Sequence, residues 1–155
     1  MTRWYFAYGS NMNPARVSAR GLRYETLCSG LLSDYRLTFD KQSRDHEGSG
    51  HANVTDAPSG RVEGVLYRLC SPDEIARMDP FENVPINYRR ARVRVATGDG
   101  HAREEVEAWT YIANPAVLRA GLRPERAYLA HLLAGRPYLS DQYYAWLSSI
   151  VCADE

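Results

Sequence analysis

Lysine is almost absent from this chain, which carries 18 arginines but a single lysine, Lys41. A Schiff-base or lysine-nucleophile mechanism would have to use Lys41, because no other lysine side chain is present. Residues 41–50 are polar and contain glycine, so the sequence predicts a loop there. We therefore expect no catalysis by lysine.

Net charge is absent as well. Nineteen basic residues balance 19 acidic ones, and the isoelectric point is about 6.9. A neutral domain has no overall field that gathers phosphate groups. The composition therefore disfavours nucleic acid and anionic membrane surfaces, and we expect neither as a partner.

Cysteine is scarce, and Cys28, Cys70 and Cys152 lie far apart without a Cys-x-x-Cys pair. The chain has no run of 18 apolar residues, and its first residues lack the apolar stretch of a signal peptide. These features predict a cytoplasmic protein with reduced thiols. Cys28 and Cys70 fall in predicted strands, where we expect them to fill the core.

Several motifs of known chemistry are also missing. The four histidines, His46, His51, His101 and His131, do not pair with carboxylates or cysteines at metal-ligand spacing. His46 and His51 stand with Asp45 and Glu47 in a polar segment whose loop composition explains them, so no metal site is expected. Walker A and Rossmann glycine patterns do not occur. Ser10 lacks the Gly-x-Ser-x-Gly context of many hydrolases, because Met12 occupies the place of the second glycine.

The order of strand and helix patterns defines a fold class. Apolar and extended patterns predict strands over residues 4–8, 25–40 (broken near 33–34), 51–56, 61–69, 88–97 and 104–113. Proline and cap signals predict helices over 14–20, 72–79, 124–133 and 140–150. The turn Gly98-Asp99-Gly100 predicts a hairpin. We expect one α+β domain over 1–155, with a mainly antiparallel, barrel-like sheet of about six or seven strands and flanking helices.

Residues 6–12 carry the strongest functional signal. An apolar, aromatic run ends at Gly9, and Asn13-Pro14 then supplies a helix N-cap and a proline at the first helical position. A strand, a small polar turn and a helix start direct several backbone N–H groups to one place, which suits a carboxylate or an oxyanion. The same pattern also fits a plain connection that needs Gly9 for its dihedral angles, including a positive φ.

A second candidate lies in residues 78–83, where a predicted helix runs into Pro80. Glu82 follows, beside Phe81 and Val84, with Tyr88 further along. A carboxylate held among apolar and aromatic groups is partly desolvated, which raises its pKa toward the range of a general base. A solvated glutamate at a helix–loop junction is the alternative interpretation.

Together these segments resemble the γ-glutamylcyclotransferase-like family. Residues 6–11 (FAYGSN) are similar to its Tyr-Gly-Ser-Asn signature, and 62–67 (VEGVLY) to its V-x-G-V-x-Y strand. Residues 78–82 resemble its L-D-x-x-E segment, with Glu82 at the position of the catalytic glutamate. Tyr88-Arg89-Arg90 opens the next strand, as in the family. Pro124 with Tyr128, and then Gly135 and residues 143–147, are similar to its C-terminal motifs.

The resemblance implies a fold and a reaction. It implies a cyclotransferase that converts a small γ-glutamyl amide into 5-oxoproline and a free amine, without metal or organic cofactor, as a monomer or homodimer. Glu82 would act as general base and acid. The residues implied to border or bind the substrate are Tyr5, Phe6, Ala7, Tyr8, Gly9, Ser10, Asn11, Tyr88 and Tyr128.

Three positions depart from the family pattern. Asn83 stands where a glycine commonly follows the glutamate, Pro80 intrudes before it, and Met78 replaces a leucine. Asparagine tolerates the left-handed conformation, so we expect activity to be retained. The identity of the γ-glutamyl compound, glutathione included, stays open. A binding module without turnover and a hydrolase that uses Ser10 remain alternatives.

Overall fold

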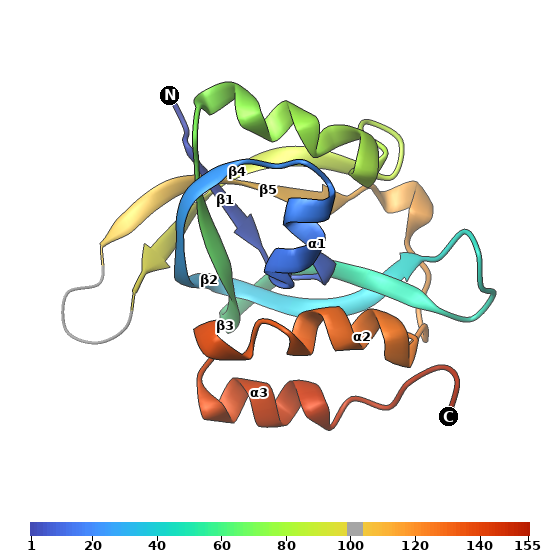
Figure 1. Cartoon of the computed structure of the whole chain (residues 1–155). Helices are drawn as coiled ribbons and strands as arrows, with labels where there is room; N and C mark the ends of the chain where they lie inside the picture. The colour runs from blue at the N-terminus through green and yellow to red at the C-terminus, as the bar shows by residue number, and fades with distance from the viewer. Residues whose placement is uncertain (99–103) are drawn as a thin grey trace.

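A closed barrel of strands forms the centre of the computed structural model, which describes residues 1–98 and 104–155 (Figure 1). Within these ranges the strands are β1 Trp4–Ala7, β2 Tyr24–Gln42, β3 Gly50–Leu69, β4 Tyr88–Thr97 and β5 Glu105–Ala113. They follow the order β1-β3-β2-β4-β5 around the barrel. Neighbouring strands pair antiparallel, except that β1 and β5 pair in parallel and close the sheet. The expected α+β class with a barrel-like sheet is confirmed, and the sheet is mixed.

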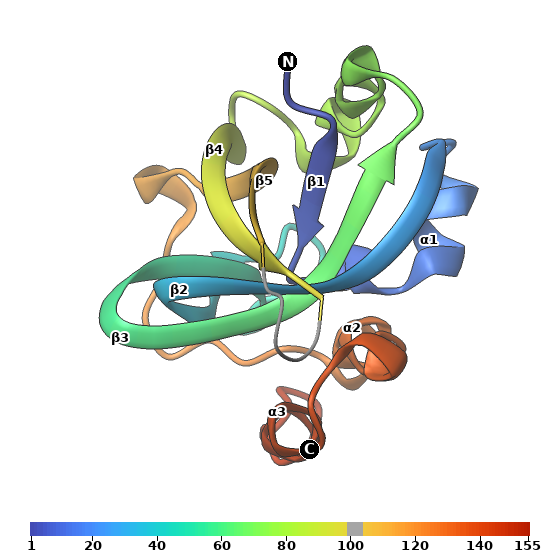
Figure 2. The ribbon, with the colours of Figure 1, turned by 90° about the vertical axis from the view of Figure 1, so that its left-hand side faces the viewer.

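The expectation of six or seven strands was wrong, because two long strands replace several short ones. β2 runs through the predicted break near residues 33–34 as a register shift, with Asp34 at a φ of 66°. The segments expected at 51–56 and 61–69 are both part of β3, which pairs with β2 from Tyr24↔Leu69 to Gln42↔Gly50. Irregularities of this kind bend a strand without ending it, and Figure 2 shows β2 and β3 curving together.

The helices lie outside the barrel. The α-helices are α1 Pro14–Ala19, α2 Arg126–Leu133 and α3 Asp141–Ser148, and the 3₁₀ helices are η1 Ser10–Met12, η2 Pro72–Arg77, η3 Asp79–Glu82, η4 Pro115–Val117 and η5 Arg136–Tyr138. The predicted cap of α1 is confirmed, since the Asn13 side chain accepts a hydrogen bond from the Ala15 N–H at 3.1 Å. The expected helix over 72–79 instead consists of η2 and the start of η3. None of the helices in the described ranges is long and apolar enough to cross a membrane.

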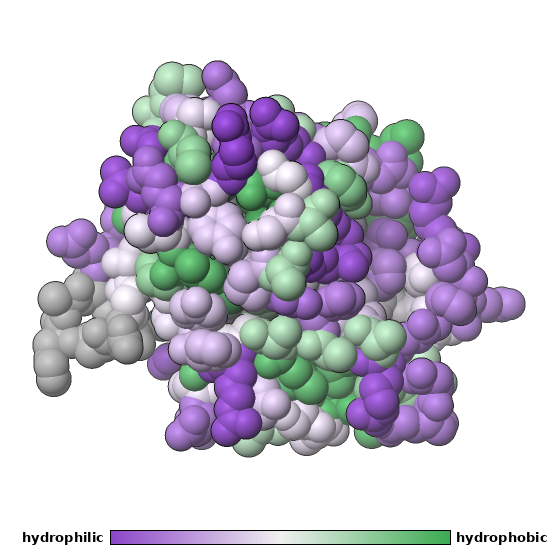
Figure 3. Space-filling view, in the orientation of Figure 1, coloured by the Kyte–Doolittle hydropathy of each residue, from purple (hydrophilic) through white to green (hydrophobic). Residues whose placement is uncertain are grey.

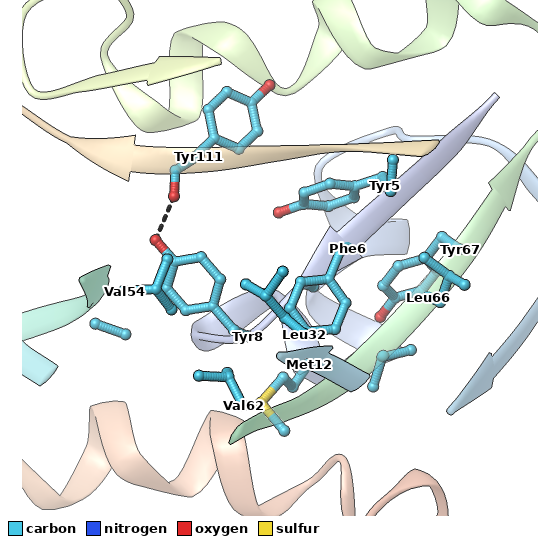
Figure 4. Close-up of a cluster of buried hydrophobic side chains, with 14 of the residues drawn as sticks. Tyr5, Phe6, Tyr8, Met12, Leu32, Val54, Val62, Leu66, Tyr67 and Tyr111 are labelled. Carbon is cyan, nitrogen blue, oxygen red and sulfur yellow. Dashed lines mark hydrogen bonds between the residues drawn. The ribbon is translucent and has the colours of Figure 1, made fainter. Parts of the chain in front are cut away.

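The core fills the barrel and the space beneath η1. Figure 4 shows buried side chains from β1, η1, β2 and β3 packed together, among them Phe6, Met12, Leu32 and Leu66. The side chains of Phe6, Met12, Leu32 and Leu66 are each at most 2% exposed. On the face of the molecule seen in Figure 3, polar and apolar residues are interspersed over the barrel, and apolar residues gather along the C-terminal helices.

The cysteines are placed differently from expectation. Cys152 is buried, Cys28 is half-buried in β2, and Cys70 is exposed just beyond the end of β3. The prediction that Cys70 fills the core was therefore wrong, because the chain leaves the sheet one residue earlier. The expected hairpin turn at Gly98-Asp99-Gly100 falls largely outside the described residues, as does His101.

Candidate active site

A cavity of about 300 Å³ lies where β1, η1, η3 and the ends of β2 and β3 meet. β1 and η1 carry the aromatic run and the turn after it, and η3 carries Glu82. Most of the cavity lining consists of aromatic and charged residues. The lining includes Tyr5, Phe6, Tyr8, Gly9, Ser10, Asn11, Arg16, Arg20, Lys41, Arg44, Asp45, His51, Ala52, Glu82, Tyr88, Tyr111 and Tyr128.

Glu82 supplies a carboxylate whose proton affinity is increased. Burial raises its pKa, while the positive charges of Arg20, Lys41 and Arg16 and a hydrogen bond from Asn11 act in the opposite direction. The hydrogen bond runs from the Asn11 amide nitrogen to Glu82 Oε1 at 3.3 Å. The carboxyl group is thus held in place and shifted toward the protonation range of a general base.

The residue that follows Glu82 has a left-handed backbone conformation. η3 ends at Asn83, whose φ of 48° and ψ of 53° are left-handed. Asparagine is one of the few side chains that adopt this conformation readily. Asn83 therefore performs the conformational role expected for it, and the departure from glycine leaves the chain path intact.

Asn11 links Glu82 to the rest of the cavity. Its amide nitrogen donates to the Tyr5 hydroxyl at 2.8 Å, and its side-chain oxygen accepts from Arg20 at 3.0 Å. Its backbone carbonyl accepts from the Tyr67 hydroxyl at 2.7 Å. Because Arg20 can only donate, it fixes the amide so that the nitrogen faces Tyr5 and Glu82.

The turn at Gly9 is packed tightly. Gly9 has a φ of −114°, so the suggestion that it requires a positive φ was wrong. An added Cβ would lie 3.1 Å from Ala52 Cβ and 3.2 Å from the Tyr128 hydroxyl oxygen. Close approach of the Ala52 and Tyr128 side chains favours glycine here.

Two tyrosines of the cavity wall are anchored on one backbone residue. The Tyr128 hydroxyl accepts a hydrogen bond from the Ala52 N–H at 2.9 Å, and the Tyr88 hydroxyl donates to the Ala52 carbonyl at 2.8 Å. Burial raises the pKa of Tyr128 to about 12. Both phenols are therefore neutral near pH 7, and they form a rigid aromatic wall.

His51 and Ser10 are not joined as a catalytic pair. The His51 ring stacks on the Tyr128 ring at 4.4 Å, and burial lowers its pKa to about 4. The contacts of His131 are with Asn13 and Arg16. None of these contacts involves the Ser10 hydroxyl, so the described residues give no support to a serine nucleophile with a histidine base.

The structure brings together most of the residues singled out from the sequence. Those that line the cavity are Tyr5, Phe6, Tyr8, Gly9, Ser10, Asn11, Glu82, Tyr88 and Tyr128. Ala7 is buried at 2% exposure in β1 and is not among the lining residues.

Sequence reasoning missed the cations of the cavity: Arg16, Arg20, Lys41 and Arg44. Lys41 was predicted in a loop, but it lies near the end of β2 and is only 4% exposed. The alternation of β2 is interrupted by a register shift between Thr38 and Lys41, so no regular two-residue pattern indicates that Lys41 is buried. The polar composition of the residues after Lys41 favoured a loop instead.

These features define a class of protein. A cavity of this size, lined by aromatic groups and containing one desolvated carboxylate among fixed donors, is characteristic of a small-molecule site. Comparison with known proteins then identifies the family. Residues 5–132 match the family described as "Gamma-glutamyl cyclotransferase, AIG2-like", and the chain belongs to it.

Individual relatives agree with this family. Proteins named gamma-glutamylcyclotransferase from Mus musculus and Homo sapiens are each 30% identical to the chain over 113 residues. The matched region is 70% of this chain and 57% of either relative, so the chain spans little more than half of their length. A solved structure named gamma-glutamyl cyclotransferase shares the fold, with a TM-score of 0.83 and 24% identity, covering 100% of this chain and 91% of that one.

Proposed function

We propose that this protein is a γ-glutamylcyclotransferase, which converts a γ-glutamyl amide into 5-oxoproline and a free amine or amino acid. The observation that carries the proposal is Glu82, whose pKa is raised by burial within a cavity lined by the Gly9–Asn11 turn. Membership of the family supports the same reaction class. A cytoplasmic location stays a prediction.

The reaction begins with a proton transfer. The α-amino group of the substrate is protonated near neutral pH, because its pKa is about 8. Glu82 takes this proton, and the freed amine attacks the γ-carbonyl carbon of the same molecule. A new C–N bond closes the five-membered ring. Holding the substrate folded in the cavity favours this step, because both reacting groups belong to one molecule.

The second half of the reaction breaks the original amide. The tetrahedral intermediate carries an oxyanion, and we assign its stabilisation to the backbone N–H groups of the turn at Gly9, Ser10 and Asn11. Glu82 then returns the proton to the leaving nitrogen as the bond from that nitrogen to the γ-carbonyl carbon breaks. The ring nitrogen gives up its second proton, and the released amine takes up a proton to become an ammonium ion. Glu82 thus ends in its starting state without a covalent enzyme intermediate.

The product separates this proposal from its alternatives. Incubation with a panel of γ-glutamyl dipeptides and γ-glutamylamines, followed by mass spectrometry, should detect 5-oxoproline. A hydrolase that uses Ser10 would release glutamate instead, and a binding module would release neither compound. Glutamate as the sole acidic product would contradict the cyclotransferase.

A further inference from the structure

The proposed mechanism assigns no role to one buried cation of the cavity. Lys41, the single lysine of the chain, is 4% exposed and lines the cavity together with Glu82. Resting on the proposed function, we propose that Lys41 is a specificity-determining residue that binds a carboxylate of the γ-glutamyl substrate.

The position of Lys41 is fixed by the β2–β3 pair. Lys41 pairs with His51 across the two strands, after a register shift that begins at Thr38. This shift sets the Lys41 ammonium beside the aromatic wall, with Nζ 5.8 Å from the centre of the Tyr88 ring. The same shift sets the adjacent His51 against the Tyr128 ring. Lys41 therefore belongs to the wall of the cavity.

No described acidic side chain forms an ion pair with the Lys41 ammonium. Among the ion pairs within residues 1–98 and 104–155, the acidic side chains pair with arginines and with His46. Burial lowers the pKa of Lys41, and the negative charge of Glu82 is the first influence that opposes this shift. A buried ammonium that forms no ion pair is costly unless an anion approaches it within hydrogen-bond distance. A bound substrate can supply that anion.

The charge of the whole cavity agrees with an anionic substrate. Four lining residues are cations, whereas Asp45 and Glu82 are the acidic ones in the described lining. His51 adds no charge at neutral pH, because burial lowers its pKa to about 4. A γ-glutamyl amino acid carries two carboxylates and one ammonium group, so it is a net anion. A γ-glutamylamine with an uncharged leaving group carries one carboxylate and is neutral overall.

A substrate carboxylate at Lys41 can come from either end of the molecule, and matched substrates separate the two sources. γ-Glutamylalanine and γ-glutamylethylamide differ by the carboxylate of the leaving group alone. Each is assayed for 5-oxoproline release with the wild type, Lys41→Met and Lys41→Arg. Arg36→Met, which removes a positive charge from an exposed position of β2 outside the cavity, is the matched control.

The expected result is a rise in KM that depends on the charge of residue 41. Lys41→Met should raise KM for γ-glutamylalanine about 10- to 100-fold, the scale of a charged hydrogen bond. Lys41→Arg should restore much of the loss, and Arg36→Met should change little. If KM for γ-glutamylethylamide is unchanged, Lys41 binds the carboxylate of the leaving group. If KM rises equally for both substrates, Lys41 binds the α-carboxylate. Unchanged KM for both substrates would overturn the proposal.

Failure of the proposed cyclotransferase function would give a different result from failure of the Lys41 proposal. If the wild type releases no 5-oxoproline from any γ-glutamyl compound, the cyclotransferase assignment fails. Binding of the same two compounds, measured by calorimetry with wild type and Lys41→Met, then still tests Lys41. Equal affinity of both proteins for both compounds would exclude a carboxylate contact, and a selective loss in Lys41→Met would support it.

Discussion

At the scale of single residues, Glu82 and Asn11 act as one unit. Asn11 donates to Glu82 Oε1, and its side-chain orientation is set by Arg20. Burial raises the pKa of Glu82, and this hydrogen bond with the neighbouring cations limits the rise. The carboxylate therefore takes up a proton more readily than an exposed glutamate, while Asn11 and the cations favour its charged form.

We expect Glu82→Gln to abolish turnover and to keep the fold. Glutamine has nearly the same shape and can still accept the hydrogen bond from Asn11, but it cannot take a proton near neutral pH. The kcat for 5-oxoproline formation should fall about a hundredfold or more, the usual scale for loss of a general base. Circular dichroism and substrate affinity should be close to those of the wild type. A folded Glu82→Gln protein with nearly normal kcat would rule out the assigned role.

The stability of the protein should also report the raised pKa of Glu82. Because burial raises this pKa in the folded state, the protonated carboxyl group favours folding below the pKa of an unfolded glutamate, about 4.3. This contribution is lost as the pH rises through the raised value. Glu82→Gln is neutral throughout, so its unfolding free energy relative to the wild type should increase between pH 4 and pH 8.

Urea denaturation across this pH range measures that difference. Glu47→Gln, which removes an exposed carboxylate outside the cavity lining, is the control and should show no such trend. A difference between Glu82→Gln and wild type that stays flat or decreases with pH would show that the pKa of Glu82 is not raised.

At the scale of elements, two substitutions that change side-chain size test the role of the turn between β1 and η1. Gly9→Val should reduce kcat/KM more than Ser10→Ala, because a Cβ at residue 9 meets Ala52 and the Tyr128 hydroxyl at 3.1 and 3.2 Å. The proposed oxyanion contacts use backbone N–H groups, which Ser10→Ala leaves in place. Both variants should be assayed for 5-oxoproline release. Loss of all activity in Ser10→Ala, with an acyl group trapped on Ser10, would favour the hydrolase.

Local patterns in the sequence predicted the elements that local chemistry controls. The cap at Asn13 and the left-handed conformation of Asn83 follow from the properties of asparagine alone. The register shifts between β2 and β3 depend on pairing between residues that are far apart in the sequence. The residues near Ser33 therefore resembled the end of a strand, although β2 continues through them. The segment 72–82 forms 3₁₀ turns around Pro80, which lacks the N–H that a continuous α-helix requires.

At the scale of the whole molecule, the cavity exists because the barrel brings distant segments together. Glu82, Tyr88 and the β1–η1 turn were identified from residues that lie in short motifs. Lys41 was missed because its burial depends on the pairing of β2 with β3, which no local pattern states. The sequence therefore predicted the buried carboxylate of the cavity and not its cations.

The last prediction concerns the nucleophile, which in the proposed mechanism belongs to the substrate and not to the protein. The cavity lining offers Glu82 as a proton acceptor, whereas the Ser10 hydroxyl has no contact with a histidine among the described residues. A γ-glutamyl amide whose α-amine is acetylated keeps the amide that would be cleaved but lacks a basic attacking nitrogen. It should therefore give no detectable free amine, while the unmodified compound gives 5-oxoproline under the same conditions. An amidase that uses its own nucleophile or water could still cleave the acetylated compound. Release of the free amine from it, at a rate comparable with the unmodified substrate, would refute cyclisation.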